Sequence, residues 1–378
     1  MQMRSSAYWL LACLAVVALA GLPTVAAADD EDTCTKQSGE LAIAACSRAI
    51  DSGRYTGRSL AADYVKRGRE YQARRDLDRA LADFSEAIRL DPTFALAFNL
   101  RGLAYKIKGD FDRAIADDDE GIRLDPTIAA AFNNRGSAYS AKGDVDRAIA
   151  DYNEAIRLDP KISSAFNSRG FAYFIKGDLE RAIADHSEAI RLNPKYAFAF
   201  LNRGAAYRAE GDLDRAIADY SEVIRLNPEY NFVLLSRGVA YYYAGSLPKA
   251  LADLNQASEL NPKLGYTALW LDILNKRSNL PSRLQQAVAQ IDMTHWPAPV
   301  IRLFLGQMTP AAVLAAADDP DPDTKNSHIC EARFYSGELA LLRDAKEEAA
   351  PLFKAAAESC PRTFIGDGAV AELKRLAQ

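Results

Sequence analysis

The sequence predicts an all-α solenoid built from helix-turn-helix repeats. An Arg-Gly pair recurs every thirty-four residues along the chain, with its glycines at Gly68, Gly102, Gly136, Gly170, Gly204 and Gly238. A proline follows each glycine at a fixed offset, at Pro92, Pro126, Pro160, Pro194, Pro228 and Pro262. A constant period of this length is typical of an array in which each unit buries its apolar face against its neighbours. Function is therefore expected on a surface and not in a pocket.

Each unit is predicted to contain two helices, as the third repeat illustrates. Small and aromatic residues recur there at helical spacing, in the order Gly136, Tyr139, Ala148, Tyr152, Ala155 and Pro160. The small residues let neighbouring backbones approach, and the two tyrosines fill the space between them. Gly143 can adopt a positive φ in the turn, and Asp144 is suited to cap the second helix. Pro160 ends that helix, because it lacks an N–H and clashes with the preceding turn.

This pattern resembles the tetratricopeptide repeat, with six full units over residues 61–264. The resemblance implies a right-handed superhelical solenoid. Residues 41–50 resemble the second helix alone, so residues 29–60 are expected to form a partial capping unit. A seventh unit with a terminal helix is expected over residues 330–378, although Ala340 replaces the usual tyrosine. Five of its residues keep the offsets of the other repeats: Gly337, Ala349, Phe353, Ala356 and Pro361.

Capping helices and a linker are predicted between these repeats, over residues 265–329. Residues 264–277 predict an apolar helix, residues 295–317 two short helices broken at prolines, and residues 318–327 the linker. The stretch WPAPVIRLFLG, followed by ICEARFYSGELALL, resembles the C-terminal half of bacterial envelope proteins of the tetratricopeptide family. One of those is an outer-membrane lipoprotein that acts as adaptor for a periplasmic tail-specific protease.

The first residues predict export. An apolar run at residues 7–20 follows Arg4, and small residues at 24–30 suit a signal peptidase. The run is too short for a stable membrane span, so residues 1–28 are predicted to be a removed signal and the protein to be periplasmic or secreted. A lipid anchor at Cys13 is the alternative, because LLAC matches a lipobox, yet Cys13 lies in the middle of the apolar run.

Four cysteines remain after removal of the signal, and an even number in an exported chain predicts disulfides. The favoured pairs are Cys34–Cys46 and Cys330–Cys360, since each lies within one terminal helical unit. Four free thiols would fit only a chain that is not exported. The net charge of -5 comes from interleaved signs, which argues against a nucleic-acid partner or an anionic membrane surface.

Charged residues also recur with the repeat. Arg precedes each glycine, and Asp follows it by fifteen residues, from Arg67 and Asp83 to Arg237 and Asp253. Because the two lie on different helices of a unit, a ladder of interhelical ion pairs is predicted. The acidic run at residues 117–120 is interpreted as a solvated helix face and not as a cation site. Asp118 replaces the packing aromatic there, so the second repeat is predicted to be the weakest.

No catalytic, metal or cofactor site is predicted, and the protein is not expected to be an enzyme. His186 occupies an aromatic packing position, whereas His295 and His328 lie in the irregular region without a nucleophile patterned nearby. Gly-rich phosphate loops, CxxC and HExxH motifs do not occur in the sequence.

The family resemblance implies that partners bind the concave face, which the first helix of each unit lines. Asparagines can bond a peptide backbone, and aromatic residues can anchor a partner. The alternative is that the C-terminal segment folds into this groove and buries the rings itself. By position, the predicted lining is Asn99, Asn133, Asn167, Asn202, Phe171, Phe174, Ile175, Arg208, Leu235, Val239, Tyr242 and Tyr243.

The sequence as a whole predicts an exported scaffold or adaptor that binds protein or peptide partners in the bacterial envelope. Nucleic acid and small-molecule cofactors are not expected, and self-association is left open. The alternative function is a non-catalytic binding module for glycan or peptidoglycan fragments, in which the tyrosines at 241–243 would be stacking platforms.

Overall fold

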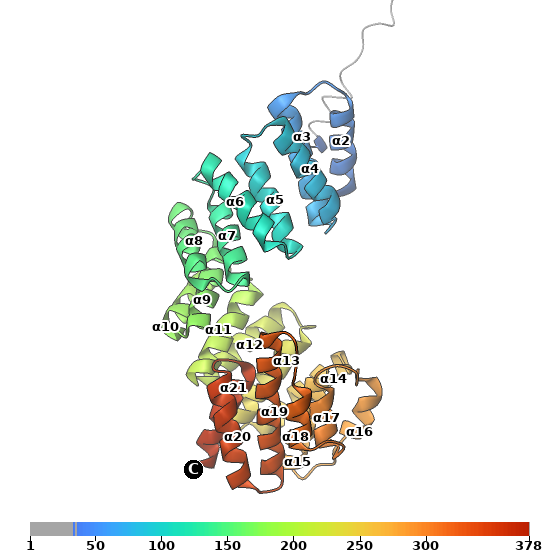
Figure 1. Ribbon diagram of the computed structural model, residues 1–378, viewed down its shortest axis with the longest axis vertical. Helices are drawn as coiled ribbons and strands as arrows, with labels where there is room; N and C mark the ends of the chain where they lie inside the picture. Colours follow the sequence, from blue (N-terminus) through green and yellow to red (C-terminus); the bar gives the residue numbers. More distant parts are fainter. Residues whose placement is uncertain (1–32, 35, 378) are drawn as a thin grey trace, which may run out of the picture. The chain divides into compact units, whose positions relative to one another are not determined.

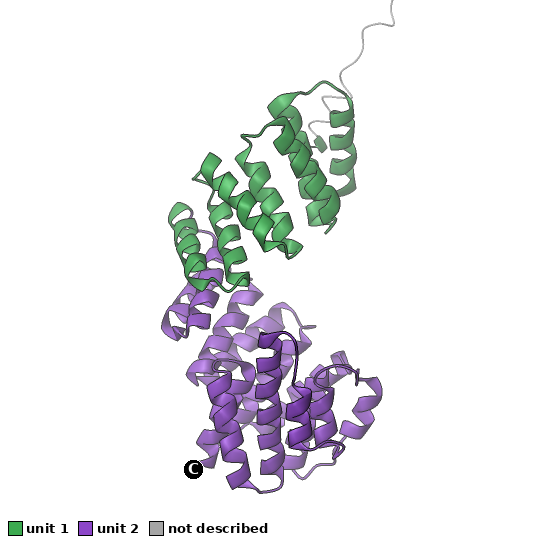
Figure 2. Cartoon of the chain, in the orientation of Figure 1, with its two compact units in different colours: residues 1–158 green, residues 159–378 purple. Residues whose placement is uncertain are grey.

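The computed structural model describes residues 33–34 and 36–377, and its regular structure in that part of the chain is helical (Figure 1). The predicted signal peptide and Cys13 lie outside the described residues. The chain divides into two compact units, which meet in sequence between Leu158 and Asp159 (Figure 2). Among the described residues, no helix combines the length and the apolar character that a membrane span needs.

In the described part of unit 1, a leading helix is followed by three helix pairs, which confirms the predicted period. Helix α2 (Gly39–Asp51) contains Cys46, and a disulfide joins this residue to Cys34, which lies before the helix, as predicted. The pairs are α3 (Gly57–Ala73) with α4 (Leu77–Leu90), α5 (Ala95–Ile107) with α6 (Phe111–Leu124), and α7 (Ala129–Ala141) with α8 (Val145–Leu158). Helix α3 begins at Gly57, four residues before the expected start at 61. Gly57 has a positive φ of 54° and follows Thr56, whose backbone is extended.

Unit 2 continues the array with three more pairs. These are α9 (Ser163–Lys176) with α10 (Leu179–Leu192), α11 (Ala197–Glu210) with α12 (Leu213–Leu226), and α13 (Asn231–Tyr243) with α14 (Leu247–Leu260). The capping region holds α15 (Gly265–Arg277), α16 (Leu284–Ala287), the 3-10 helix η1 (Val288–Gln290), α17 (Ala298–Phe304) and α18 (Pro310–Ala316). The last three helices are α19 (Pro322–Leu342), α20 (Lys346–Ser359) and α21 (Phe364–Leu376). The predicted helices in residues 264–277 and 295–317 are confirmed, whereas α16 and η1 are too short to give a periodic signal.

The predicted packing of a glycine against a large ring is present in most repeats, whereas Asp118 and Leu254 take the place of the ring opposite Gly102 and Gly238. A Cβ atom at Gly136 would lie 2.9 Å from the Tyr152 ring, and one at Gly337 would lie 2.8 Å from Phe353. Gly143 has a φ of 82°, and the Asp144 carboxylate accepts a hydrogen bond from the Arg147 backbone N–H. The glycines of the repeat therefore let the two helices of a pair approach until an aromatic ring touches the opposite backbone.

The linker prediction is wrong in its second half, because α19 begins at Pro322. Asp321 caps this helix by accepting a hydrogen bond from the Thr324 N–H at 2.8 Å. Proline is favoured in a first helical turn, where its missing N–H would be unpaired in any case. Cys330 consequently lies inside α19 and not at its start. Its predicted disulfide with Cys360, at the end of α20, is present, with the Cα atoms 6.3 Å apart.

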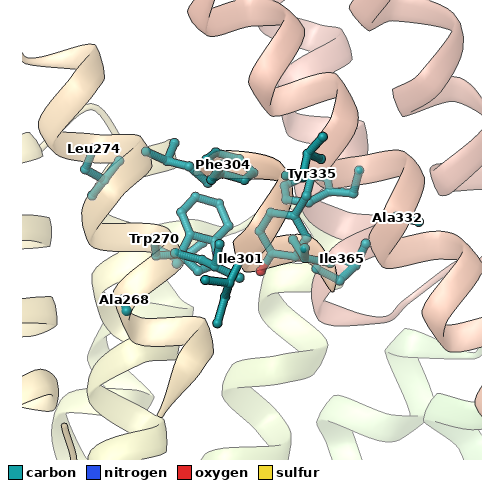
Figure 3. Close-up of a cluster of buried hydrophobic side chains, with 14 of the residues drawn as sticks. Ala268, Trp270, Leu274, Ile301, Phe304, Ala332, Tyr335 and Ile365 are labelled. Carbon is teal, nitrogen blue, oxygen red and sulfur yellow. The ribbon is translucent and has the colours of Figure 1, made fainter. Parts of the chain in front are cut away.

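The largest core belongs to unit 2 and joins the capping region to the last repeat. Figure 3 shows Trp270 of α15 close to Phe304 of α17, Tyr335 of α19 and Ile365 of α21. Trp270 is only 1% exposed, and its ring lies 5.9 Å from that of Phe334 between centroids. Helices α13, α15, α19 and α21 thus bury their apolar faces together.

The predicted Arg–Asp ladder is confirmed in all six repeats. Each guanidinium donates from Nε and Nη2 to both oxygens of its carboxylate, over 2.6 to 2.9 Å. The sequence did not predict the third contact that several of these arginines make. Nη1 of Arg101 donates to the Ser85 hydroxyl of the preceding repeat, and Nη1 of Arg203 donates to that of Ser187. Such an arginine therefore links its own helix to two others, one in its own repeat and one in the preceding repeat.

Candidate partner-binding surface

In unit 2, the chain's own C-terminal helices cover much of the predicted groove. Leu235, Val239 and Tyr242 of α13 are 3%, 2% and 4% exposed, because they pack into the core with α15, α19 and α21. Tyr243 lies beside the Trp270 ring, with 6.2 Å between centroids, and its hydroxyl is buried. The prediction that these four residues line an open groove is therefore wrong. The apolar lining is part of a core that α15, α19 and α21 complete, and the last two of these helices lie far later in the sequence.

Polar contacts fix α21 on this surface. The Arg208 guanidinium of α11 lies 3.1 Å from the Asp367 carboxylate, and its Nη1 donates to the Phe364 carbonyl at 3.3 Å. The Tyr242 hydroxyl donates to the Glu372 carboxylate at 3.3 Å. Burial raises the pKa of Asp367, because the charged carboxylate loses water there. Arg208, a predicted partner-binding residue, thus binds α21.

A buried ionic cluster lies beneath α21. Arg277 of α15 donates to Glu338 of α19 at 2.6 Å and lies 3.3 Å from the Glu372 carboxylate. It also hydrogen-bonds the Tyr242 hydroxyl. Glu338 is fully buried, and burial raises the pKa of its carboxyl to about 8. One cation is thus shared by two carboxyl groups that have almost no access to water.

The three apolar residues of α9 that were predicted to line the groove remain at least partly accessible. Phe171 and Ile175 are 43% and 40% exposed, and the Phe171 and Phe174 rings stack with 6.4 Å between centroids. Arg362, in the turn before α21, donates to the Ile175 carbonyl at 3.2 Å and lies beside Gly177. This apolar surface therefore lies directly beside the point where α21 begins.

Two of the predicted asparagines are buried and bond to neighbouring side chains of the protein. Asn99 donates to Asp118 at 2.9 Å, and the Asn167 oxygen accepts from Asn202 at 3.1 Å and lies 3.1 Å from His186 Nδ1. Asn133 is half-buried. The prediction that these amides are free to bond a peptide is therefore wrong for Asn99 and Asn167. His186 packs between helices as predicted, and burial lowers the pKa of its imidazole to about 3.

The acidic run does not form one solvated face. Asp117 belongs to the ladder, Asp119 pairs with Arg135, and Glu120 pairs with Arg123. Asp118 is fully buried at the position that Phe84 and Tyr152 occupy in other repeats. Among the residues that the structure describes, none of the His, Cys, Asp and Glu side chains form a group suited to hold a metal ion.

Asp118 and Lys106 give the second repeat a polar interior. Burial raises the pKa of Asp118 to about 8, although the hydrogen bond from Asn99 and the nearby charge of Lys106 lower it. Burial also lowers the pKa of Lys106, whose ammonium donates to the Asn134 side chain at 3.0 Å. A carboxyl whose pKa is higher in the folded than in the unfolded chain stabilises the fold at low pH. That contribution is lost as the pH rises through the folded value.

We therefore expect the Asp118→Asn substitution to stabilise the protein at pH 8 by about 1–3 kcal/mol and to have little effect near pH 4. The amide keeps an acceptor for Asn99 and removes the buried charge. Circular dichroism melting at both pH values measures the effect. Asp214→Asn, at an exposed position, is the matched control. A stabilisation that does not depend on pH would contradict the assignment to Asp118.

The tyrosines at 241–243 do not form an exposed stacking platform. Tyr242 and Tyr243 lie beneath α21, and Arg237 and Lys249 lie over the Tyr241 ring at 5.7 and 5.3 Å. The observation that favoured a glycan-binding module is thereby removed.

In unit 1, the first helix of the second repeat presents apolar side chains to solvent. Leu96 and Ile107 of α5 are 39% and 46% exposed, and they lie at opposite ends of the helix. Sequence reasoning did not single out either residue, although both occupy first-helix positions equivalent to Phe198 and Tyr243 in later repeats.

Comparisons with known proteins agree with this architecture. Models described as tetratricopeptide repeat match residues 65–127, 129–162 and 197–230, and one described as TPR repeat matches residues 170–209. No curated protein matches the sequence. The chain is 30% identical to MamA over 43% of its own length and 95% of that protein, with a TM-score of 0.40.

Two further solved structures have the same fold. PilW, a widely conserved type IV pilus biogenesis factor, is 19% identical over 55% of this chain and 96% of its own, with a TM-score of 0.52. PilF of Pseudomonas aeruginosa is 18% identical over 55% of this chain and 94% of its own, with a TM-score of 0.50. Tetratricopeptide proteins mediate protein–protein interactions. The thirty-four-residue period, the glycine-to-ring packing and the matching family models together show that the chain belongs to the tetratricopeptide repeat family.

Proposed function

We propose that the protein is an exported adaptor or scaffold that binds protein or peptide partners through the first helices of its repeats. The observation that carries this proposal is the binding of α21 by α11 and α13. Arg208 and Tyr242 belong to the first helices of their repeats, and both contact an amphipathic helix from a distant part of the chain. The first-helix face of this protein is therefore chemically suited to hold a helical polypeptide.

Two parts of this face are accessible to another polypeptide. Leu96 and Ile107 provide exposed apolar side chains in unit 1, and Phe171 and Ile175 provide them in unit 2. Exposed apolar side chains flanked by polar groups are typical of protein-binding surfaces. We assign partner binding to these two patches and not to the covered residues of α13.

Export is supported by the cysteines. Both pairs form disulfides within the described chain, and disulfides persist in oxidising compartments such as the bacterial periplasm. The proposal therefore places the protein in the bacterial envelope after removal of residues 1–28, with lipid anchoring at Cys13 as the alternative.

A crosslinking pull-down from periplasmic extract tests the proposed surface. Two full-length variants replace the exposed pairs, one with Leu96→Asp and Ile107→Asp, the other with Phe171→Asp and Ile175→Asp. We expect at least one of them to lower recovery of a specific partner about tenfold, because burying a carboxylate in an apolar interface is unfavourable.

Leu314→Asp is the matched control, since Leu314 of α18 is 43% exposed and lies outside the repeats. Circular dichroism checks that each variant keeps its helices. Unchanged recovery of every partner by both double variants would show that neither patch binds partners.

A further inference from the structure

We propose that the surface formed by α11, α13 and α15, together with α19 and α20, is a receptor for an amphipathic helix that buries two carboxylates, and that α21 is its exchangeable resident. A helix of the same chemistry from a partner protein would take the place of α21. This inference rests on the proposed function, because it names the kind of partner that the first-helix face accepts. The receptor is a third candidate partner-binding surface, beside the two exposed patches, and α21 covers it while this helix is bound.

Charge complementarity defines the ligand. The receptor contributes the cations Arg208 and Arg277, and α21 contributes the carboxylates Asp367 and Glu372 to them. These two carboxylates are five residues apart, and both are largely buried against the receptor, with side-chain exposures of 12% and 1%. A helix without acidic groups at this spacing would leave Arg208 without its carboxylate and Arg277 with Glu338 alone.

Close approach defines the rest of the ligand. The buried side of α21 carries Gly366, Gly368 and Ala369, with Ile365 as its buried large aliphatic residue. A Cβ atom at Gly368 would lie 3.0 Å from the Tyr243 hydroxyl and 3.2 Å from the Phe334 ring. The receptor therefore accepts a helix whose central residues are small.

Two features make α21 a replaceable ligand. Its glycines lower its helix propensity, since glycine in a helix interior is less favourable than alanine. In addition, the Tyr243 hydroxyl and the Glu338 Oε1 atom are buried beneath α21 without a hydrogen-bond partner among the described residues. Unpaired buried polar groups weaken a contact, so a helix that pairs them has an advantage over α21.

Binding of a peptide copy of α21 tests this exchange. A fluorescent synthetic peptide of residues 362–377 is titrated against full-length protein, and anisotropy reports binding. Asp367→Arg in the protein repels its own α21 from Arg208 but leaves the receptor intact. We expect this variant to bind the peptide at least tenfold more tightly than the wild-type protein does.

Two further variants make the result specific. The double variant Arg208→Glu with Asp367→Arg restores the intramolecular pair with inverted charges and repels the native peptide, so tight binding should be lost. Glu358→Arg changes the net charge equally at an exposed position on α20 and should bind as the wild type does. Equal peptide binding by all four proteins, or no binding by a helical Asp367→Arg variant, would overturn the proposal.

Hydrogen exchange of the wild-type protein provides a test without any substitution. If α21 is exchangeable, its amides should exchange at least tenfold faster than those of α13, because they open without global unfolding. Equal protection of α21 and α13 would overturn the proposal. The pull-down variants at Leu96, Ile107, Phe171 and Ile175 lie outside α21 and its ion pairs. A failed peptide exchange together with a successful pull-down would therefore overturn this inference alone.

Discussion

Tyr242→Ala is expected to lower the free energy of unfolding by about 3–5 kcal/mol, as truncation of a core aromatic does. Tyr242 is 4% exposed, and its ring lies 6.2 Å from that of Trp270 and beneath the Arg375 guanidinium. The substitution also removes the hydroxyl that Arg277 and Glu372 share. Chemical denaturation followed by tryptophan fluorescence measures the change, because Trp270 belongs to the same core.

Phe171→Ala is the matched comparison. Phe171 occupies a first-helix position of the fourth repeat but is 43% exposed, so its truncation should cost about 1 kcal/mol or less. The two variants thus separate a residue covered by the C-terminal helices from one that stays accessible. Comparable small losses from both would mean that Tyr242 is not part of the core in solution.

Arg277→Met is expected to destabilise the protein by about 3–5 kcal/mol at pH 7, because it leaves two buried acidic groups without the cation that they share. Glu338 and Glu372 are 0% and 1% exposed, and both lie within contact distance of the Arg277 guanidinium. Thermal and denaturant unfolding of the variant at several pH values measures the loss.

The loss should depend on pH in a defined direction. Burial raises the pKa of Glu338 from 4.5 to about 8, so its contribution to stability is present at low pH and is lost as the pH rises through that range. Removal of the neighbouring cation raises this pKa further, so the variant keeps losing stability at pH values where the wild type no longer does. The difference between the two proteins should therefore grow as the pH rises above about 8. Arg343→Met removes an exposed pair with Glu348 and should cost at most about 1 kcal/mol at any pH. An Arg277→Met loss that does not grow between pH 7 and pH 10 would contradict the buried cluster.

The repeat array could be predicted from the sequence because its determinants are local. Gly136 and Tyr152 meet within one helix pair, and Arg135 and Asp151 bond within the same pair, so the thirty-four-residue period specifies both contacts. Cys330 and Cys360 also lie within one pair, and their disulfide follows from the same reasoning.

The state of the groove could not be predicted, because it depends on contacts between distant segments. Tyr242 and Glu372 are 130 residues apart, and Arg208 and Asp367 are 159 residues apart in the sequence. An aromatic side chain on a first helix has the same pattern whether a partner or the chain itself covers it. The burial of Asp118 could not be predicted for a different reason. In the sequence it is one carboxylate in a charged run, and only the structure shows that Asn99 and Lys106 lie beside it.

The three-helix contacts of the ladder arginines determine how the array loses its structure. Arg237 belongs to one repeat but also hydrogen-bonds Ser221 of the repeat before it, as Arg203 does with Ser187. Melting of a single repeat would therefore remove a hydrogen bond from the arginine of the next repeat. Part of the free-energy cost of melting one repeat thus falls on its neighbour. Nearest-neighbour coupling of this kind makes repeats unfold in blocks and suppresses fraying of one repeat at a time. Within each unit, the arginine that orders a helix pair is thus also the source of its cooperativity with the preceding pair.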